Sequence, residues 1–359
     1  MSQFKVDAIT NRDGSHGPQL CGITTFTSSG VTLPSGPTEM RGGRGRGVIA
    51  GGYNYPSGQL NIIQKIEIAT TGNATDFGDL ARTAYSGGGF ASATRGIYAG
   101  GRAEASPFPD IHTQIQYITM SSQGGSNDFG DMSYQGGTGV RGASNNSRGL
   151  IFGGIYPASP ASINQNNIDF ITIASTGNAT SFGSLTTYMY ASGAASSPTR
   201  AVIAGGQRST GTPTSPLTIQ NIIEFITIDT QGNAQDFGDL ALSLRATSGA
   251  SSGTRAVFAG GYNASPIAYN QGSNQISYIT MASEGNAQDF GDLGGTSFST
   301  SVSNSIRGVF GAGPNDPAHT NVLEYVTIAS TGNGTDFGDM TTKVFSSSQN
   351  IADAHGGIG

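Results

Sequence analysis

The tripeptide Asp-Phe-Gly is the repeated motif that most suggests chemistry. Five copies begin with an aspartate and a sixth with a serine: Asp76, Asp128, Ser181, Asp236, Asp289 and Asp336. In protein kinases this tripeptide holds magnesium, but only beside a catalytic loop and a strand that carries a lysine. Neither accompanies it here, and a catalytic centre does not recur in every repeat. We therefore predict that Asp and Gly form turns and that Phe fills the space between neighbouring repeats.

The histidines and the single cysteine do not form a catalytic or metal-binding set. None of the four histidines, His16, His112, His319 and His355, has the spacing of metal ligands. Cys21 has no partner for an intrachain disulfide, and no Ser-His-Asp combination stands out. We therefore expect a protein that is not an enzyme and that uses no metal or other cofactor. A glycan-active enzyme remains a distant alternative.

An arginine followed by glycine or alanine is the second repeated feature. Its six copies are Arg46, Arg95, Arg148, Arg200, Arg255 and Arg307. Each lies six residues before the second member of a small-residue pair such as Gly100-Gly101. A ring of guanidinium groups at one end of the fold could bind carboxylates. Alternatively, each arginine caps backbone carbonyls or stacks between repeats. We favour the structural role, because a ligand site usually breaks the symmetry of a repeat.

The constant spacings imply rigid elements, and we expect four strands in each repeat. The first is rich in glycine and serine, as at 81–92, and the second begins with the arginine. The third is of the type Ile223-Glu-Phe-Ile-Thr-Ile, and the fourth surrounds Asp-Phe-Gly-Asp. Alternate side chains of the third strand are apolar on both faces, so each sheet must pack between two neighbours. The sequence therefore predicts an all-β, six-bladed β-propeller of four-stranded blades.

The repeat phenylalanines each lie nine residues after a fixed apolar position. They are Phe77, Phe129, Phe182, Phe237, Phe290 and Phe337. After the last of them, the chain from Lys343 to Ile351 has the pattern of a first strand, which the repeat beginning at Arg46 lacks. We therefore expect the C-terminal strand to complete the first blade, so that 42–359 form one closed propeller.

The repeat resembles the kelch repeat over residues 42 to 355. Kelch blades have a period of about 50 residues and four strands; they carry a double glycine after an apolar strand and an aromatic residue in the next strand. That aromatic residue is present here as Tyr117, Phe170, Phe225, Tyr278 and Tyr325. The repeat phenylalanine takes the place of the kelch tryptophan, and tryptophan is absent from the chain. The resemblance implies a divergent kelch-like propeller.

Nearly all length variation falls between the small-residue pair and the third strand. These loops, 53–62, 102–114, 155–167, 207–222, 262–275 and 314–322, contain 10, 13, 13, 16, 14 and 9 residues. In a propeller they gather on one face, and aromatic and arginine side chains there suit sugar or protein recognition. The candidate ligand-binding residues are Tyr53, Tyr55, Arg102, Phe108, Tyr156, Arg208, Tyr262 and Tyr269. The alternative is that these are merely tolerated surface loops.

Composition favours β-structure and excludes several classes of partner. Glycine accounts for 56 of 359 residues, and only 11% of residues are charged, which favours short strands and glycine-rich turns. The net charge of −6 includes no basic stripe, so we expect no nucleic-acid partner. No run approaches the roughly 20 apolar residues of a membrane span, and residues 1–5 lack the apolar core of a signal peptide. We therefore expect synthesis in a cytoplasm and no membrane insertion.

Residues 1–41 precede the repeats and are too few to bury a core alone. They either lie against the propeller or dock onto another protein, and we favour the second. Three arm segments begin at Ala8 (Ala-Ile-Thr-Asn-Arg-Asp-Gly), Gly22 (Gly-Ile-Thr-Thr-Phe) and Leu33 (Leu-Pro-Ser-Gly-Pro-Thr). With Arg44-Gly-Arg-Gly-Val and Thr71-Gly-Asn-Ala-Thr-Asp-Phe-Gly-Asp, they resemble the arm-plus-propeller, tail-fibre-like structural proteins of marine cyanophages.

That resemblance implies a role in the virion. The arm would bind other virion proteins, and the protein would be oligomeric in the particle. The propeller would display its loops for host-surface recognition, with cell-surface carbohydrate as the ligand. The alternative is a capsid- or tail-decorating protein whose propeller contacts only neighbouring virion proteins.

Overall fold

The computed structural model describes residues 25–27, 30–32, 45–54, 58–103, 110–156, 162–209, 218–263, 272–295, 300–315, 318–344 and 349–358. Within these residues all regular secondary structure is β-strand, and there is no helix. The described strands include six antiparallel sheets of four strands each. The predicted all-β architecture and the four strands per repeat are confirmed, and the arrangement is compatible with a β-propeller.

The four strands of each sheet occur in the expected order, as in β8-β9-β12-β13. The first strands are β35 (Gln349–Ala352), β8 (Gly88–Ala91), β14 (Arg141–Ser144), β21 (Gly193–Ser196), β27 (Ser248–Ser251) and β31 (Thr300–Ser303). The second strands are β3 (Arg46–Ala50), β9 (Arg95–Ala99), β15 (Arg148–Phe152), β22 (Arg200–Ala204), β28 (Arg255–Ala259) and β32 (Arg307–Asn315). The third strands are β6 (Ile62–Glu67), β12 (Gln114–Thr119), β18 (Asn167–Thr172), β25 (Ile222–Thr227), β29 (Gln275–Thr280) and β33 (Ala318–Thr327). The fourth strands are β7 (Thr75–Asp79), β13 (Asn127–Asp131), β19 (Thr180–Ser184), β26 (Gln235–Asp239), β30 (Gln288–Asp292) and β34 (Thr335–Asp339).

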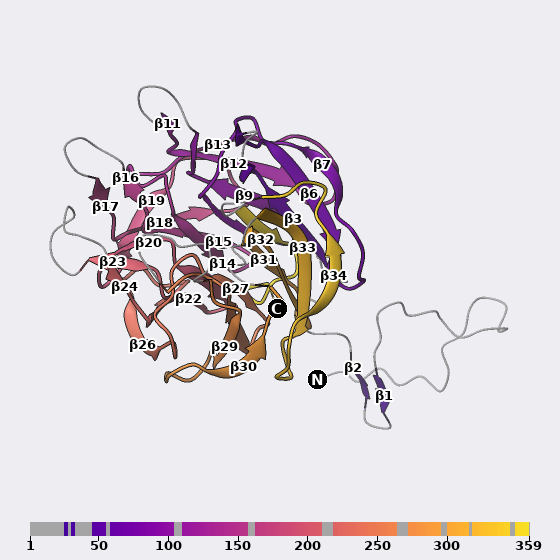
Figure 1. Cartoon of the computed structure of the whole chain (residues 1–359). Helices are drawn as coiled ribbons and strands as arrows, with labels where there is room; N and C mark the ends of the chain where they lie inside the picture. The colour runs from indigo at the N-terminus through magenta and orange to yellow at the C-terminus, as the bar shows by residue number, and fades with distance from the viewer. Residues whose placement is uncertain are drawn as a thin grey trace, which may run out of the picture.

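The first strands lie together at the centre of the molecule. They contact one another in the order β35, β8, β14, β21, β27, β31 and back to β35. Figure 1 shows β14, β27 and β31 near the middle and β7, β26 and β30 at the periphery. Small residues allow this approach, since a Cβ at Gly249 would collide with the backbone of Ala194. Hydroxyls then join neighbouring strands: Ser251 Oγ donates to Ser196 O at 2.8 Å.

The C-terminal strand completes the sheet that contains Arg46. Strand β35 pairs with β3, Gly47 lying opposite Ala352 and Ala50 opposite Gln349. Arg46 N–H also donates to Asp353 Oδ1 at 2.8 Å. The predicted pairing of a C-terminal strand with the first repeat is therefore confirmed.

The core lies between neighbouring sheets. One cluster combines Val48 and Phe77 of one sheet with Tyr98 and Ile118 of the next. The third strand is covered on both faces, with Ile223 and Ile226 each at most 1% exposed. The six repeat phenylalanines are all buried, and five of them meet the aromatic ring of their own third strand edge-to-face at 5.9–6.1 Å.

The Asp-Phe-Gly-Asp segment joins the outer edge of one sheet to a turn of the next. Phe237 O accepts a hydrogen bond from Gly285 N–H at 2.8 Å, and Asn286 Oδ1 accepts one from Asp239 N–H at 3.1 Å. Gly238 has a φ of +145°, and a Cβ there would lie 2.5 Å from Gly285 O. Asp236, Phe237 and Gly238 lie inside strand β26, at a shift in its register with β25. The prediction that Asp and Gly form a turn is therefore wrong, because the positive φ of Gly238 serves an irregularity within the strand, whereas Phe237 packs between two sheets as predicted.

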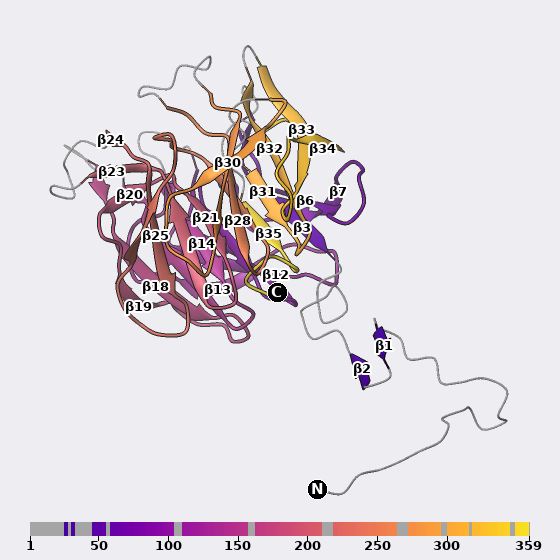
Figure 2. The same cartoon turned by 90° about the horizontal axis from the view of Figure 1, so that it is seen from below.

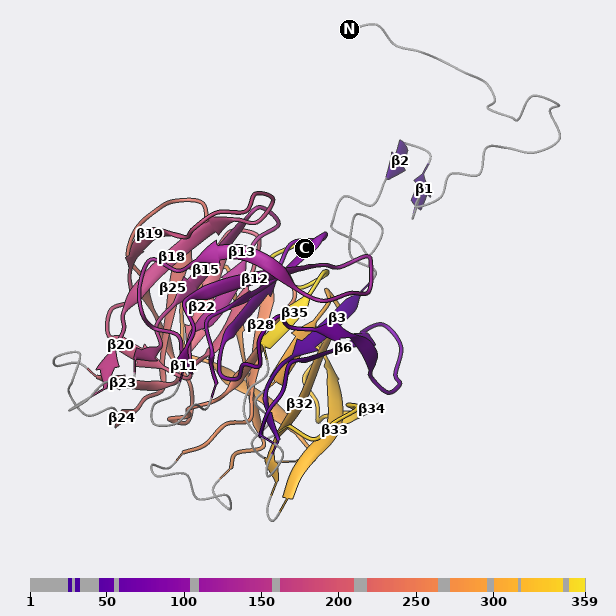
Figure 3. The ribbon, with the colours of Figure 1, turned by 90° about the horizontal axis from the view of Figure 1, so that it is seen from above.

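Short strands lie in the connecting segments at one end of the four-stranded sheets. They are β4 (Tyr53–Asn54), β5 (Gly58–Gln59), β10 (Arg102–Ala103), β11 (Asp110–Ile111), β16 (Ile155–Tyr156), β17 (Ile163–Asn164), β20 (Tyr188–Tyr190), β23 (Gln207–Ser209) and β24 (Thr218–Ile219). Figures 2 and 3 show β20, β23 and β24 together at one end of the sheets. We call this end the loop face, and the opposite end, where the second strands begin, the arginine face. Strands β1 (Thr25–Thr27) and β2 (Gly30–Thr32) pair with each other.

Candidate functional site

The repeat arginines on the arginine face bind the neighbouring sheet rather than solvent alone. Arg255 Nη1 donates to Ile328 O at 3.0 Å, and its guanidinium lies 4.3 Å from the centre of the Tyr278 ring. Arg200 repeats this arrangement with Met281 O at 3.2 Å. Both acceptors belong to the fixed apolar position of the following repeat. The guanidinium groups are thus engaged in capping and in cation–π contacts.

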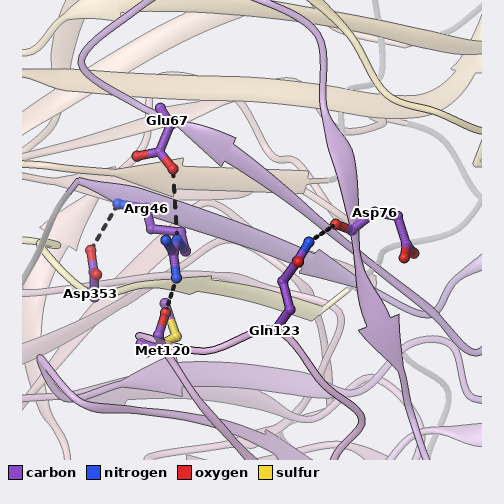
Figure 4. Close-up of polar contacts among 6 residues, drawn as sticks. All are labelled: Arg46, Glu67, Asp76, Met120, Gln123 and Asp353. Atoms are coloured by element: carbon purple, nitrogen blue, oxygen red, sulfur yellow. Dashed lines mark hydrogen bonds and ion pairs between the residues drawn. The ribbon is translucent and has the colours of Figure 1, made fainter.

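The pattern continues through all six arginines and returns to the first sheet. The remaining acceptors are Met120 O for Arg46, Ile173 O and Ala174 O for Arg95, Ile228 O for Arg148, and Ile68 O and Ala69 O for Arg307. Figure 4 shows Arg46 between Glu67 of its own sheet and Met120 of the next. These contacts are those of a structural residue.

Residues 353–358 cover the first strands at the arginine face. His355 Nε2 lies 3.0 Å from Ala91 O and 3.2 Å from Ser144 Oγ, while its Nδ1 accepts a hydrogen bond from Gly357 N–H at 3.0 Å. Nδ1 is thus the acceptor and Nε2 carries the proton of the neutral ring. Burial lowers the pKa of His355 to about 4. The imidazole is therefore neutral at physiological pH.

A cavity of about 80 Å³ runs between the first strands. His355 lines it at the arginine face, and Ser192 and Thr247 line it at the loop face. Its walls are glycine, alanine and serine for the most part, because only small residues allow the first strands to approach one another. We take this cavity and its loop-face rim as the candidate functional site.

Two arginines that the repeat pattern does not contain lie at this rim. Arg141 Nε donates to Ser192 O at 2.6 Å, and its Nη1 donates to Val140 O at 2.9 Å. Arg245 Nη1 donates to Gln207 Oε1 at 2.7 Å. Burial lowers the pKa of Arg141 to about 10, and both guanidinium groups interact electrostatically with Tyr190. Both side chains remain positively charged at neutral pH.

The rim backbone is held in an uncommon conformation. Ser86, Ala191 and Ala246 have φ values of 59°, 55° and 55°, a region that residues other than glycine seldom adopt. They are linked around the rim by backbone hydrogen bonds, including Ala246 N–H to Ala191 O at 2.7 Å and Gly139 N–H to Ser86 O at 2.6 Å. The rim is therefore a fixed frame for the side chains that it carries.

Some of the predicted ligand-binding residues do form a cluster on the loop face. The Tyr53 and Tyr85 rings are 5.4 Å apart, and the Arg102 guanidinium lies 4.9 Å from the centre of the Tyr85 ring. Arg102 Nε also donates to the Tyr85 hydroxyl. Tyr53, Arg102 and Tyr156 are each half-buried. Tyr55, Phe108 and Tyr269 lie outside the described residues.

Two predicted ligand-binding residues are buried, so their assignment to an exposed binding surface is wrong. Arg208 is 1% exposed and forms an ion pair with Glu224 at 2.8 Å. It also donates to Gly205 O at 3.1 Å. Tyr262 is 3% exposed, and its backbone pairs with Arg245. The lengths of the loops did not indicate that these two side chains are buried.

Sequence reasoning also missed a buried polar residue near the start of each third strand. The six are Gln64, Gln116, Asp169, Glu224, Ser277 and Glu324. Several of them bind the linker that precedes the first strand of their own sheet: Glu324 Oε2 accepts from Gly294 N–H at 2.7 Å, and Asp169 Oδ2 accepts from Ser133 N–H at 2.7 Å. The signal was present, because each is a polar residue within an otherwise apolar strand.

No protein-family model matches this chain, and no curated protein matches it. Within the described part of the chain, no three His, Cys, Asp or Glu residues are placed to hold a metal ion. The described residues also contain no helix long and apolar enough to cross a membrane.

Proposed function

We propose that this chain is a six-bladed, kelch-like β-propeller that serves as a non-enzymatic structural protein of a phage particle. Residues 1–41 would attach it to other virion proteins, and the loop face would bind carbohydrate of the host surface. The virion role rests on the resemblance of the arm and the repeat to cyanophage proteins. The binding role rests on the geometry of the loop face.

The observation that carries the binding role is the contrast between the two faces. The repeat arginines on the arginine face are engaged by carbonyls of the neighbouring sheet, as Arg255 is by Ile328 O. On the loop face the residues differ from repeat to repeat, and the half-buried Tyr53 and Arg102 gather there around the buried ring of Tyr85. Aromatic faces and arginine on a rigid scaffold are suited to binding sugars.

Three sets of contacts support the closure of six repeats into a ring: one at the centre, one at the arginine face and one at the periphery. The first strands contact one another in a cycle, and the arginine contacts return from Arg307 to Ile68 and Ala69. At the periphery, Gly72 N–H of the first repeat donates to Phe337 O of the last at 2.8 Å. A ring of six repeats accounts for all three.

A glycan array probed with the full chain tests the binding role. We expect binding to a restricted set of host-envelope saccharides, weakened at least several-fold by Arg102→Ala. The matched control is Arg82→Ala, which removes an exposed arginine from the linker between β7 and β8. Absence of binding to every saccharide would refute the adhesive role and favour a decorating protein.

The attachment role requires a separate experiment on assembled particles. We expect a chain without residues 1–41 to fold but to be missing from purified particles. Normal incorporation of that shortened chain would contradict an anchoring arm. Release of shortened products from host polysaccharide would instead show an enzyme.

A further inference from the structure

We propose that the cavity between the first strands binds one carboxylate or sulfate group of an acidic saccharide, with Arg141 as its anchoring residue. This rests on the proposed binding function and deepens it by naming the chemical class of the glycan. The saccharide would approach from the loop face, because residues 353–358 cover the arginine face.

The charge of the cavity comes from a single side chain. Arg141 is the only charged residue in the six first strands, whose other members are almost all Gly, Ala, Ser, Thr and apolar residues. Equivalent positions in the other five sheets carry Gly88, Gly193, Ser248, Thr300 and Gln349, none of which is charged. The sixfold pattern is thus broken at one place on the cavity wall, as expected of a ligand site and not of a scaffold.

The Arg141 guanidinium has donors to spare. Of its five N–H groups, one on Nε binds Ser192 O and one on Nη1 binds Val140 O. Both acceptors are backbone carbonyls, and no carboxylate among the described residues pairs with this arginine. Three N–H groups therefore have no protein acceptor in the described part of the chain. A planar oxyanion can accept two of them in parallel.

A second polar group points to a ligand at the same place. Ser192 is fully buried and lines the cavity, and its Oγ has no hydrogen-bond partner. Buried hydroxyls are normally paired, since leaving one unpaired costs about 1–3 kcal/mol. An oxyanion held by Arg141, which already binds the carbonyl of this residue, would provide the missing acceptor. The site thus has a charge and a neutral donor side by side.

The surroundings favour an anion over a cation or a neutral group. Arg245 adds a second positive charge at the rim, where its Nε is buried without a hydrogen-bond partner. At the other end of the cavity His355 is neutral. Among the described residues that line the cavity, none is acidic. A negative charge entering it therefore meets only attraction from the charged side chains of the described residues.

The size of the cavity limits what enters. About 80 Å³ accommodates several water molecules or one small oxyanion. We place the pyranose at the rim, where Ser86, Ala191 and Ala246 fix the backbone. This geometry selects saccharides that project a carboxylate or sulfate from the ring.

Isothermal titration calorimetry of the full chain tests the site with three probes: an oligomer of glucuronic acid, the matching oligomer of glucose, and sodium sulfate. We expect the acidic oligomer to bind and the neutral one to bind at least tenfold more weakly. Arg141→Gln should weaken acidic-oligomer binding at least tenfold. The matched control Arg82→Gln removes the same charge outside the cavity and should leave the affinity unchanged.

Two further measurements keep the outcome decisive. If Arg141→Gln does not fold, Arg141→Lys keeps the charge without the planar fork and should bind several-fold more weakly. Sulfate should raise the melting temperature of the wild type and Arg82→Gln more than that of Arg141→Gln, which tests the anion site without any sugar.

The outcomes separate this proposal from the binding function on which it rests. Equal affinity of wild type and Arg141→Gln for the acidic oligomer would overturn the site, as would a preference for the neutral oligomer, while glycan binding itself would stand. Loss of all saccharide binding with a preserved sulfate effect at Arg141 would support the anion site and refute glycan recognition. An equal sulfate effect in all variants would overturn the anion site.

Discussion

Replacing Arg255 with methionine distinguishes a structural role of the repeat arginines from a ligand-binding role. Methionine keeps most of the aliphatic side chain but removes the charge, the hydrogen bond to Ile328 O at 3.0 Å and the stacking on Tyr278 at 4.3 Å. We expect Arg255→Met to destabilise the fold. A ligand-binding arginine would leave stability nearly unchanged.

The size of the effect follows from these two contacts. A hydrogen bond from a charged donor contributes about 1.5–3 kcal/mol when buried, and partial exposure of Arg255 reduces this to about 1 kcal/mol. Cation–π stacking at a partly exposed site adds about 0.5–1 kcal/mol. The loss is thus about 1.5–2 kcal/mol. For a large domain, about 2–4 °C per kcal/mol gives a fall in Tm of about 3–8 °C.

Differential scanning calorimetry of Arg255→Met beside Arg82→Met measures this effect. The control loses an exposed arginine from the linker between β7 and β8, so its Tm should change by less than about 1 °C. Arg148→Met should behave like Arg255→Met, because its Nη1 donates to Ile228 O at 2.9 Å. If both repeat variants melt with the control, the capping interpretation is refuted.

Three other perturbations test the closure, the turns and the C-terminal segment. Ile351→Ala in the closing strand should cost about 2–5 kcal/mol in denaturant unfolding, because this side chain is 1% exposed; a loss below about 0.5 kcal/mol would contradict closure through β35. Gly238→Ala, with its φ of +145° and the close Gly285 carbonyl, should cost at least about 1–3 kcal/mol, whereas Gly232→Ala meets no atom within 4 Å and should be nearly neutral. The pKa of His355 is lowered from 6.5 to about 4, so the unfolded chain binds a proton that the folded chain does not; stability should fall as pH drops from 6.5 to 4, by at most about 3 kcal/mol. His355→Gln should remove this part of the pH dependence, and an unchanged profile would show that the histidine is not buried as a neutral ring.

The sequence predicted those features that repeat. Constant spacings around the arginine and the Asp-Phe-Gly motif located the second, third and fourth strands, because rigid hydrogen-bonded elements do not tolerate insertions. The missing first strand of the initial repeat also predicted the pairing that β35 makes with β3. In each case the prediction rested on spacings that recur in the six repeats, because each repeat must form the same strands.

The loop face was predicted less well because each loop occurs once. Tyr53 and Arg102 do lie in one cluster, joined by Tyr85 from a different segment. Arg208 instead lies in the interior, where it forms an ion pair with Glu224. That glutamate belongs to the set of polar residues in the third strands, and a single sequence does not show which of them will meet a charged partner from a loop.

Arg141 shows why a repeat conceals the residue that departs from it. It stands at a first-strand position that is otherwise uncharged, at the opposite end of the sheets from the conspicuous arginines that begin the second strands. The repeated arginines find acceptors in the next sheet because every sheet presents the same carbonyl. Arg141 has no charged counterpart in the other five four-stranded sheets, so no repeated acceptor is arranged for it beyond Ser192 O and Val140 O. A charge retained in a cavity at the centre, without a carboxylate partner among the described residues, costs desolvation energy that a scaffold does not require. An arriving oxyanion would recover that energy, which is why the unrepeated arginine and not the arginine ring is the place to look for a ligand.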